Sequence, residues 1–180
     1  MHTSVLLLCL FLWGCYGDFN AWQVLKNNDD GIFLVKRSFA ENRSTPCIYF
    51  IKRNVRETMH RIEAFYGHWN GHHYTEHAYV VQTENGTKGA DSVVTISSSA
   101  YNNGEVNTFD IEYIDNKTQC TIMKGTNGSL SSQCFMWVPE KFANTTLTEC
   151  NKKYEGLGCD ATSEPYKDYN GTCPSQEKWE

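Results

Sequence analysis

The sequence lacks several features that define common classes of protein. Beyond residues 1–17, no apolar run reaches the about 20 residues that a membrane-spanning helix needs. Lysine and arginine form no cluster, since Lys52-Arg53 and Lys152-Lys153 are isolated pairs and the formal net charge is −5. A basic stripe that could follow a phosphate backbone is therefore missing. These absences argue against a membrane span and against a nucleic-acid partner.

Catalytic motifs are missing as well. The chain has no Gly-x-Ser-x-Gly, no metal-ligand triad and no glycine-rich loop that could hold a phosphate. It also has no Cys-x-x-Cys pair, which argues against a zinc site built from thiolates. We therefore expect no enzyme activity, no cofactor and no metal.

Residues 1–17 have the pattern of a secretory signal peptide. Val5–Trp13 is an unbroken apolar run, and Cys15-Tyr16-Gly17 places small residues at the two positions that a signal peptidase reads. The run is too short to cross a bilayer. We expect cleavage after Gly17, a mature domain of residues 18–180, and a secreted, extracellular protein.

Six cysteines remain once Cys9 and Cys15 leave with the signal peptide. They are Cys47, Cys120, Cys134, Cys150, Cys159 and Cys173. An even number of cysteines in a secreted chain predicts disulfides, here three, and leaves no free thiol to act as a nucleophile. The pairing stays open at this point, because the sequence alone allows many combinations.

Six asparagines carry a serine or threonine two residues later and are therefore acceptors for N-linked sugars. They are Asn42, Asn85, Asn116, Asn127, Asn144 and Asn170. A glycosylated asparagine must face solvent, so these positions mark exposed turns and the ends of elements. We expect a glycoprotein in which most of these sites are occupied.

Short β-like runs separated by turn residues dominate the chain after the signal peptide. They are Ile32–Phe39, Cys47–Lys52, Met59–Tyr66, His73–Gln82, Ser92–Ser97, Val106–Ile114, Cys120–Met123 and Ser132–Val138. Eight such runs suffice to close an antiparallel barrel. A short helix capped by Asp18 is predicted before the first run, and residues Thr145–Lys153 predict a second helix that ends at Gly156-Leu157-Gly158.

A pattern in the second half of the chain resembles a signature of the tick salivary lipocalins, the histamine-binding family. It consists of Cys120-Thr121-Ile122, then Phe135-Met136-Trp137, then Cys150. Near the N-terminus, Ala21-Trp22 and Cys47 look similar to the same family. The resemblance implies an all-β, eight-stranded antiparallel lipocalin barrel with a short N-terminal helix and a C-terminal helix.

The same resemblance implies a disulfide pairing. In the family, the first cysteine joins the tail to the barrel, and the two motif cysteines join a late strand to the C-terminal helix. Carried over to this chain, these bonds are Cys47–Cys173 and Cys120–Cys150. The third pair is then Cys134–Cys159.

The family's amine binders have carboxylates where this chain has Thr121 and Phe135. A buried cationic amine needs such a partner, because desolvating its charge costs several kcal/mol. Asp110, Glu112 and Glu84 remain as possible inward carboxylates. If Phe109 points into the barrel, strand alternation turns Asp110 and Glu112 outward. This chain therefore lacks the carboxylates with which the family's amine binders would hold a cationic amine.

The pocket that remains is aromatic and apolar. Its predicted ligand-binding residues are Phe33, Tyr49, Tyr79, Tyr101, Phe109, Phe135 and Trp137, of which Tyr101, Phe109 and Trp137 match aromatic positions of the family. The alternative is that these side chains only fill the core. The pattern favours a small apolar ligand of the sterol or fatty-acid type. The protein that carries it would modulate host immune or inflammatory defence.

Two other functions stay open beside this one. The first is sequestration of histamine or another biogenic amine. The second is immunomodulation through the outer surface, by contact with a host immune cell or protein, as in the Japanin-like branch of the family.

Histidines gather in residues 68–73, whose sequence is His-Trp-Asn-Gly-His-His. Asn70-Gly71 predicts a two-residue hairpin turn, which would place His68 opposite His73. Paired imidazoles can share a metal ion, but no nearby carboxylate completes a set of ligands. An exposed polar hairpin is the prediction here.

Overall fold

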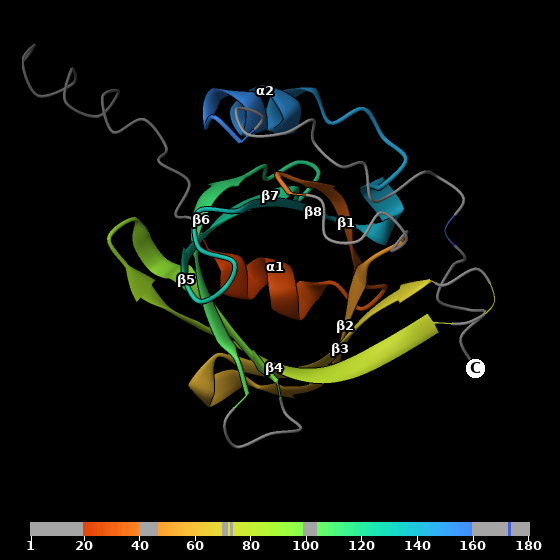
Figure 1. The fold of residues 1–180 in the computed structure, drawn as a ribbon, viewed down its shortest axis with the longest axis vertical. Coiled ribbons are helices and arrows are strands. Elements are labelled where there is room, and N and C mark those ends of the chain that lie inside the picture. The colour runs from red at the N-terminus through yellow and green to blue at the C-terminus, as the bar shows by residue number, and fades with distance from the viewer. Residues whose placement is uncertain are drawn as a thin grey trace, which may run out of the picture.

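The computed structural model describes residues 20–39, 47–69, 72, 74–98, 104–159 and 173. Within them lie eight strands: β1 (Ile32–Arg37), β2 (Tyr49–Arg56), β3 (Arg61–Trp69), β4 (Tyr74–Gly86), β5 (Gly89–Ser98), β6 (Val106–Ile114), β7 (Thr121–Asn127) and β8 (Cys134–Pro139). Each strand pairs antiparallel with the next, and β8 pairs with β1 to close the barrel (Figure 1). The predicted fold class is confirmed.

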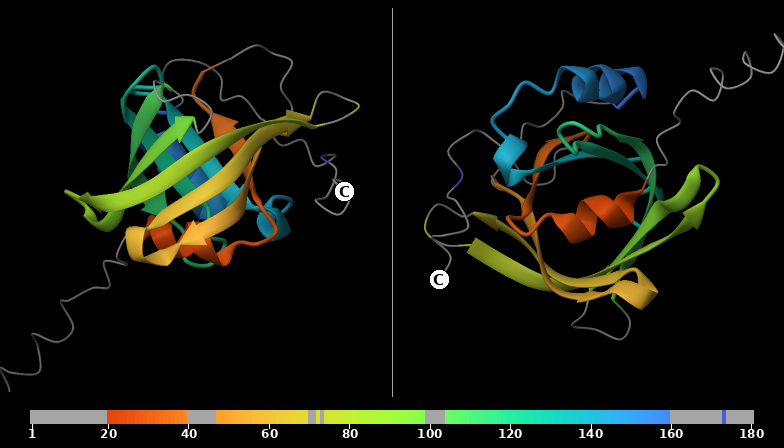
Figure 2. Two further views of the ribbon diagram at one scale, coloured as in Figure 1. Left: turned by 90° about the horizontal axis from the view of Figure 1, so that it is seen from below. Right: turned by 180° about the vertical axis from the view of Figure 1, so that it is seen from behind.

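A short helix, α1 (Ala21–Asn27), lies across one end of the barrel, as the side view in Figure 2 shows. The backbone N–H of Gln23 donates to the side chain of Asn20 at 3.0 Å, so Asn20 caps the helix. The predicted cap, Asp18, lies outside the described residues. The inner side of α1 carries the apolar side chains Ala21 and Val24, which are buried and close this end of the barrel.

The second helix, α2 (Thr148–Gly156), packs on the outside of the barrel (Figure 1). It begins at Thr148 rather than Thr145, because residues 143–147 follow a 3-10 turn, η2 (Glu140–Phe142), and are not helical. Leu147 and Tyr154 join a second cluster of buried side chains on the outer face of β7 and β8. This cluster is separate from the barrel interior.

Three disulfides tie these parts together: Cys47–Cys173, Cys120–Cys150 and Cys134–Cys159. They are the pairs that the family resemblance implies. Two of them attach α2 to the barrel: Cys150 in the first turn of the helix bonds to Cys120, just before β7, and Cys159, after the helix, bonds to Cys134 at the start of β8. The third bonds residue 173 of the tail to the outer side of the barrel, where Cys173 packs against the buried side chains of Phe33, Tyr49 and Ile51.

Two local predictions about the strands are wrong. The strand predicted from Met59 begins at Arg61, because Glu57–Met59 form a 3-10 turn, η1, that ends at His60 with a φ of 45°. In the next hairpin, β3 and β4 pair His68 with Thr75 and Trp69 with Tyr74. The two-residue turn at Asn70-Gly71, with His68 opposite His73, is therefore excluded by the register.

Four of the predicted glycosylation sites lie among the described residues, and all four are exposed: Asn85, Asn116, Asn127 and Asn144. Asn42 and Asn170 lie outside the described residues. In the described part of the chain, no helix is long and apolar enough to cross a membrane.

Candidate ligand-binding site

The barrel encloses a cavity of about 250 Å³ that α1 closes at one end. This volume lies just below the range of about 300–1,000 Å³ that is usual for ligand pockets, so it suits one slender molecule. Aliphatic side chains from α1 and from the strands supply much of the wall. The aromatic part of the wall is formed by Phe39, Phe50, Tyr66, Tyr79, Phe109, Phe135 and Trp137.

Most of the aromatic rings on the wall contact one another in two groups, one around Phe135 and one around Tyr66. Phe109 and Phe135 meet edge to face with their centroids 5.4 Å apart, and Phe39 meets Phe135 at 5.4 Å from the other side. Tyr66 contacts Trp137 at 6.4 Å. Such tilted pairs add about 0.5–1.5 kcal/mol beyond the burial of their area, which keeps the cavity wall in one arrangement.

Four of the seven predicted ligand-binding residues line this cavity: Tyr79, Phe109, Phe135 and Trp137. They come from β4, β6 and β8 and point inward at alternate positions of their strands, as the pleat requires. Tyr101 lies outside the described residues. Whether these side chains touch a ligand stays a prediction.

Phe33 and Tyr49 were expected in the cavity and are not part of its wall. Ile32 and Leu34 of β1 point inward, so strand alternation turns Phe33 outward. Phe50 of β2 points inward, and Tyr49 is turned outward in the same way. The ring of Tyr49 lies beside Gly67, where a Cβ atom would come within 2.8 Å of its Cζ. Both aromatic side chains are buried on the outer side of the barrel, beside Cys173 of the Cys47–Cys173 disulfide. Their apolar character therefore did not show on which side of the barrel they lie.

The two motif positions do face the cavity. Thr121 and Phe135 line it, so a hydroxyl and a phenyl group stand where the family's amine binders have carboxylates. The other carboxylates weighed from the sequence lie elsewhere. Glu112 pairs with Lys88 at 2.5 Å, and Glu84 is exposed and accepts from the amide of Gln82 at 3.5 Å.

One carboxylate that sequence reasoning missed, Glu105, does line the cavity. It immediately precedes β6 and is exposed, so it lies at the rim. The backbone N–H of Ser129 donates to its Oε1 atom at 3.2 Å. Hydrogen bonding by Ser129 also holds the pKa of Glu105 below its usual value. Glu105 is separated by two and four positions from Asn107 and Phe109, which also line the cavity. Extending the strand alternation back from Phe109 would therefore have identified it.

A second missed residue is Arg37, which lines the cavity and is 1% exposed. Its guanidinium lies 5.5 Å from the ring centroid of Phe39. If the side chains of β1 alternated regularly from the inward-pointing Leu34, Arg37 would point outward. The pairing of β1 with β8 shifts register between Leu34 and Lys36, and this irregularity reverses the alternation.

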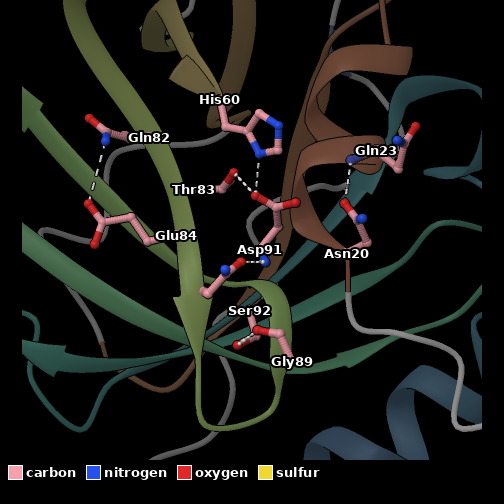
Figure 3. Close-up of polar contacts among 10 residues, drawn as sticks. Asn20, Gln23, His60, Gln82, Thr83, Glu84, Gly89, Asp91 and Ser92 are labelled. Carbon is pink, nitrogen blue, oxygen red and sulfur yellow. Dashed lines mark hydrogen bonds and ion pairs between the residues drawn. The ribbon is translucent and has the colours of Figure 1, made fainter. Parts of the chain in front are cut away.

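A cluster of side chains beside α1 helps to hold this helix across the end of the barrel, and Figure 3 shows its polar members His60, Thr83 and Asp91. The ring of Trp22 from α1 stacks on His60 at 4.8 Å with an interplanar angle of 2°. His60 Nδ1 lies 2.6 Å from Asp91 Oδ1, and the hydroxyl of Thr83 donates to the same oxygen at 2.6 Å. The cluster joins α1 to β4 and β5, so it fixes the floor of the cavity.

Among the described residues, no group of three or more histidine, cysteine, aspartate or glutamate side chains could hold a metal ion. The register of β3 and β4 also removes the histidine pair on which a metal site would have been built.

Comparisons with known proteins agree with this geometry. A family model described as tick histamine binding protein matches residues 17–175. Among solved structures, the chain is similar to the AM182 serotonin complex, with a TM-score of 0.65 and 15% identity over 88% of this chain and 95% of that one. It is also similar to Japanin from Rhipicephalus appendiculatus bound to cholesterol, with a TM-score of 0.54 and 14% identity over 81% of this chain and 96% of that one. At these identities the likeness shows the fold. No curated protein matches the sequence.

Proposed function

Because this chain belongs to the tick histamine-binding protein family, we propose that it is a secreted carrier of a small, mainly apolar host molecule, of the sterol or fatty-acid type, and that it modulates host immune or inflammatory defence. The observation that carries this proposal is the cavity wall. Thr121 and Phe135 replace the carboxylates that an amine would need, and aromatic and aliphatic side chains supply most of the remaining surface.

The energy of such binding comes mainly from removing apolar surface from water. At roughly 25 cal/mol per Å², a ligand that buries about 200 Å² of apolar surface gains about 5 kcal/mol. A tyrosine hydroxyl, such as that of Tyr79, can add one orienting hydrogen bond, as polar groups do in mostly apolar sites. Japanin, one of the similar structures, is bound to cholesterol, which supports a neutral apolar ligand as one candidate.

The remaining features of the proposal rest on the sequence. Residues 1–17 supply the signal peptide, and the four exposed sequons among the described residues suit a glycoprotein made in the secretory pathway. Disulfides belong to the same oxidising compartment.

A direct test starts with recombinant protein from a eukaryotic secretory host. Native mass spectrometry before and after organic extraction should reveal a co-purifying apolar mass. Emptied protein should then change its Trp137 fluorescence when cholesterol or oleic acid is added.

The variant Phe109→Glu places a charge on the cavity wall and should abolish that response while the disulfides stay intact. Val106→Glu is the matched control, because Val106 lies on the same strand and is 48% exposed. Unchanged affinity in the Phe109→Glu variant would contradict the cavity site, and action through the outer surface would then be the better account.

Sequestration of an amine is the second candidate, because one observation favours it. Glu105 lines the rim of the cavity and is ionised at neutral pH, so it could face a cationic ligand. It is exposed to water, however, where an ion pair contributes little. Calorimetry with histamine and serotonin tests this candidate, and sub-micromolar binding that is lost in Glu105→Gln would favour it over the apolar carrier.

A further inference from the structure

The connection between β7 and β8, residues 128–133, is called the mouth loop here, and it lies at the end of the barrel away from α1. The preceding turn, between β6 and β7, lies beside α1, because Asn28 donates to the side chain of Gln119 at 2.9 Å. Successive connections of an antiparallel barrel alternate between its two ends, so the mouth loop is at the other end, as the left view of Figure 2 shows. Two of its residues, Ser129 and Leu130, line the cavity.

Two side chains hold the mouth loop by its backbone. Glu105 accepts from the N–H of Ser129 at 3.2 Å, and Oδ1 of Asn107 accepts from the N–H of Leu130 at 3.1 Å. Both acceptors line the cavity themselves. Gly128 has a φ of 88°, and a Cβ atom at this position would overlap the side chain of Asn107. The loop therefore fits closely against the start of β6.

Leu130 is the part of the mouth loop that faces inward. It is half-buried and packs against the core cluster of the barrel. Four other residues of the loop are exposed: Gly128, Ser129, Ser131 and Ser132. The turn bond from the N–H of Ser131 to the carbonyl of Gly128, at 3.2 Å, lies within the loop and would persist if the loop swung outward. A segment with so little buried apolar surface can open locally at low cost.

The opposite end of the cavity is held more firmly. Trp22 of α1 is 3% exposed and stacks on His60. Asn28, just after α1, bonds both to the carbonyl of Val24 and to Gln119. Moving α1 would expose a large aromatic side chain, whereas moving the mouth loop withdraws one half-buried leucine. Because exposing apolar surface costs free energy in proportion to its area, the mouth loop offers the easier way into the cavity.

We propose that the mouth loop is a gate for the ligand, latched shut by Glu105 and Asn107, and that the ligand enters and leaves the cavity when these two hydrogen bonds open. This inference rests on the proposed function and adds the route of the ligand and the element that regulates its rate. A gate of this kind slows entry and exit alike, because the ligand passes it in both directions.

The test uses the delipidated, fully oxidised protein and oleic acid as the probe. Stopped-flow tryptophan fluorescence gives the rates of association and release. The double variant Glu105→Ala with Asn107→Ala removes both acceptors and should raise both rates about 10- to 30-fold, since one hydrogen bond of ordinary strength corresponds to about fivefold. The Kd should change by less than about threefold. Hydrogen exchange at residues 128–133 should be faster in the double variant before any probe is added.

Three further variants separate the latch from other effects. Glu105→Gln keeps a side-chain oxygen that can accept from Ser129, so it should restore most of the slow rates. Val106→Ala is the matched control, because Val106 lies between the two latch residues and is 48% exposed, and it should change neither rate. Glu105→Ala alone changes an exposed position and should raise both rates about fivefold. It supplies the test if the double variant fails to fold.

The possible results separate the gate from the carrier function. Faster hydrogen exchange with unchanged binding rates overturns the gate, since the ligand then passes elsewhere, and leaves the apolar carrier standing. Faster release with an unchanged association rate also overturns it, because Glu105 and Asn107 would then be ligand contacts and not a latch. Exchange that stays unchanged in the variants overturns the latch itself. If the wild-type chain binds neither oleic acid nor cholesterol, the proposed function fails, and the gate fails with it.

Discussion

Two side chains of the cavity wall support the proposal that the ligand is apolar. Thr121 is 6% exposed and Phe135 is 7% exposed, and both line the wall. Neither can carry a charge. A cationic amine beside these two positions would lose its hydration without gaining a charged partner there, which costs several kcal/mol.

We therefore expect histamine to bind weakly or not at all, as measured by calorimetry. The double variant Thr121→Asp with Phe135→Glu should raise histamine affinity at least about tenfold, because each carboxylate would then face the cavity. Far-UV circular dichroism checks that the barrel survives. A double variant that folds but gains no affinity would show that the scaffold around these positions, and not their charge, excludes the amine.

At the scale of single elements, α1 acts as the floor of the cavity, and one stack holds it in place. Trp22 is 3% exposed and lies flat on His60, whose position is set by Asp91. Helix α1 is short, so its own backbone bonds contribute little and packing has to hold it.

Replacing Trp22 with alanine should lower the free energy of unfolding by about 3–5 kcal/mol, the usual cost of deleting a buried tryptophan. It should also speed the release of an apolar probe, since the floor loses its anchor. Gln23→Ala in the same helix is the control, because that side chain is exposed, and its effect should stay within about 0.5 kcal/mol. Denaturant titration and stopped-flow release measure the two effects.

The turn between β6 and β7 offers a pH-dependent test. Burial alone would raise the pKa of Asp115, but hydrogen bonds from Thr118 and Lys117 outweigh it and hold that pKa below its usual value. A depressed pKa in the folded state means that the carboxylate stabilises the fold above the unfolded-state pKa of about 3.9. This contribution is lost as the pH falls through the lower, folded-state pKa.

Asp115→Ala should therefore destabilise the protein at neutral pH by about 1 kcal/mol, the typical value of a turn or capping carboxylate. The difference from the wild-type chain should shrink as the pH falls into the acid range. Urea titrations at several pH values measure it. A difference that stays constant with pH would contradict the role of the charge.

At the scale of the whole molecule, three disulfides join the barrel to segments that would otherwise pack weakly. The longest loop, closed by Cys47–Cys173, has a sequence separation of 126 residues, and the others span 30 and 25. In the chain-entropy model, these loops correspond to about 5 kcal/mol for the first bond and about 3.5 kcal/mol for each of the others.

Replacing Cys47 and Cys173 together with serine should lower the stability by up to about 5 kcal/mol and yet leave ligand binding nearly unchanged. The reason is that this bond lies over Phe33 and Tyr49, outside the cavity. Denaturant unfolding and probe titration provide the two readouts, and peptide mapping without reduction should show the other two bonds intact. A large loss of affinity would mean that the tail shapes the cavity after all.

Much of this molecule follows from local sequence. The alternation of apolar and polar residues, together with the turn residues, predicted eight strands. A strand with one buried face shows this alternation within its own sequence. The motif residues Thr121 and Phe135 were recognised as cavity positions, and the family resemblance implied the disulfide pairing found in the structure. These features depend on residues close in sequence, or on spacing that relatives share.

The tertiary structure decided which face of each strand looks inward. Phe33 and Tyr49 are as apolar as the residues that line the cavity, yet they lie on the outer side of the barrel, where Cys173 packs against them. Arg37 lies inside because β1 shifts register against β8, a strand about a hundred residues away in the chain. Because side chains alternate with a period of two, one irregular pairing exchanges Lys36 and Arg37 between solvent and cavity. No pattern within β1 carries that information, and the charge inside the barrel depends on it.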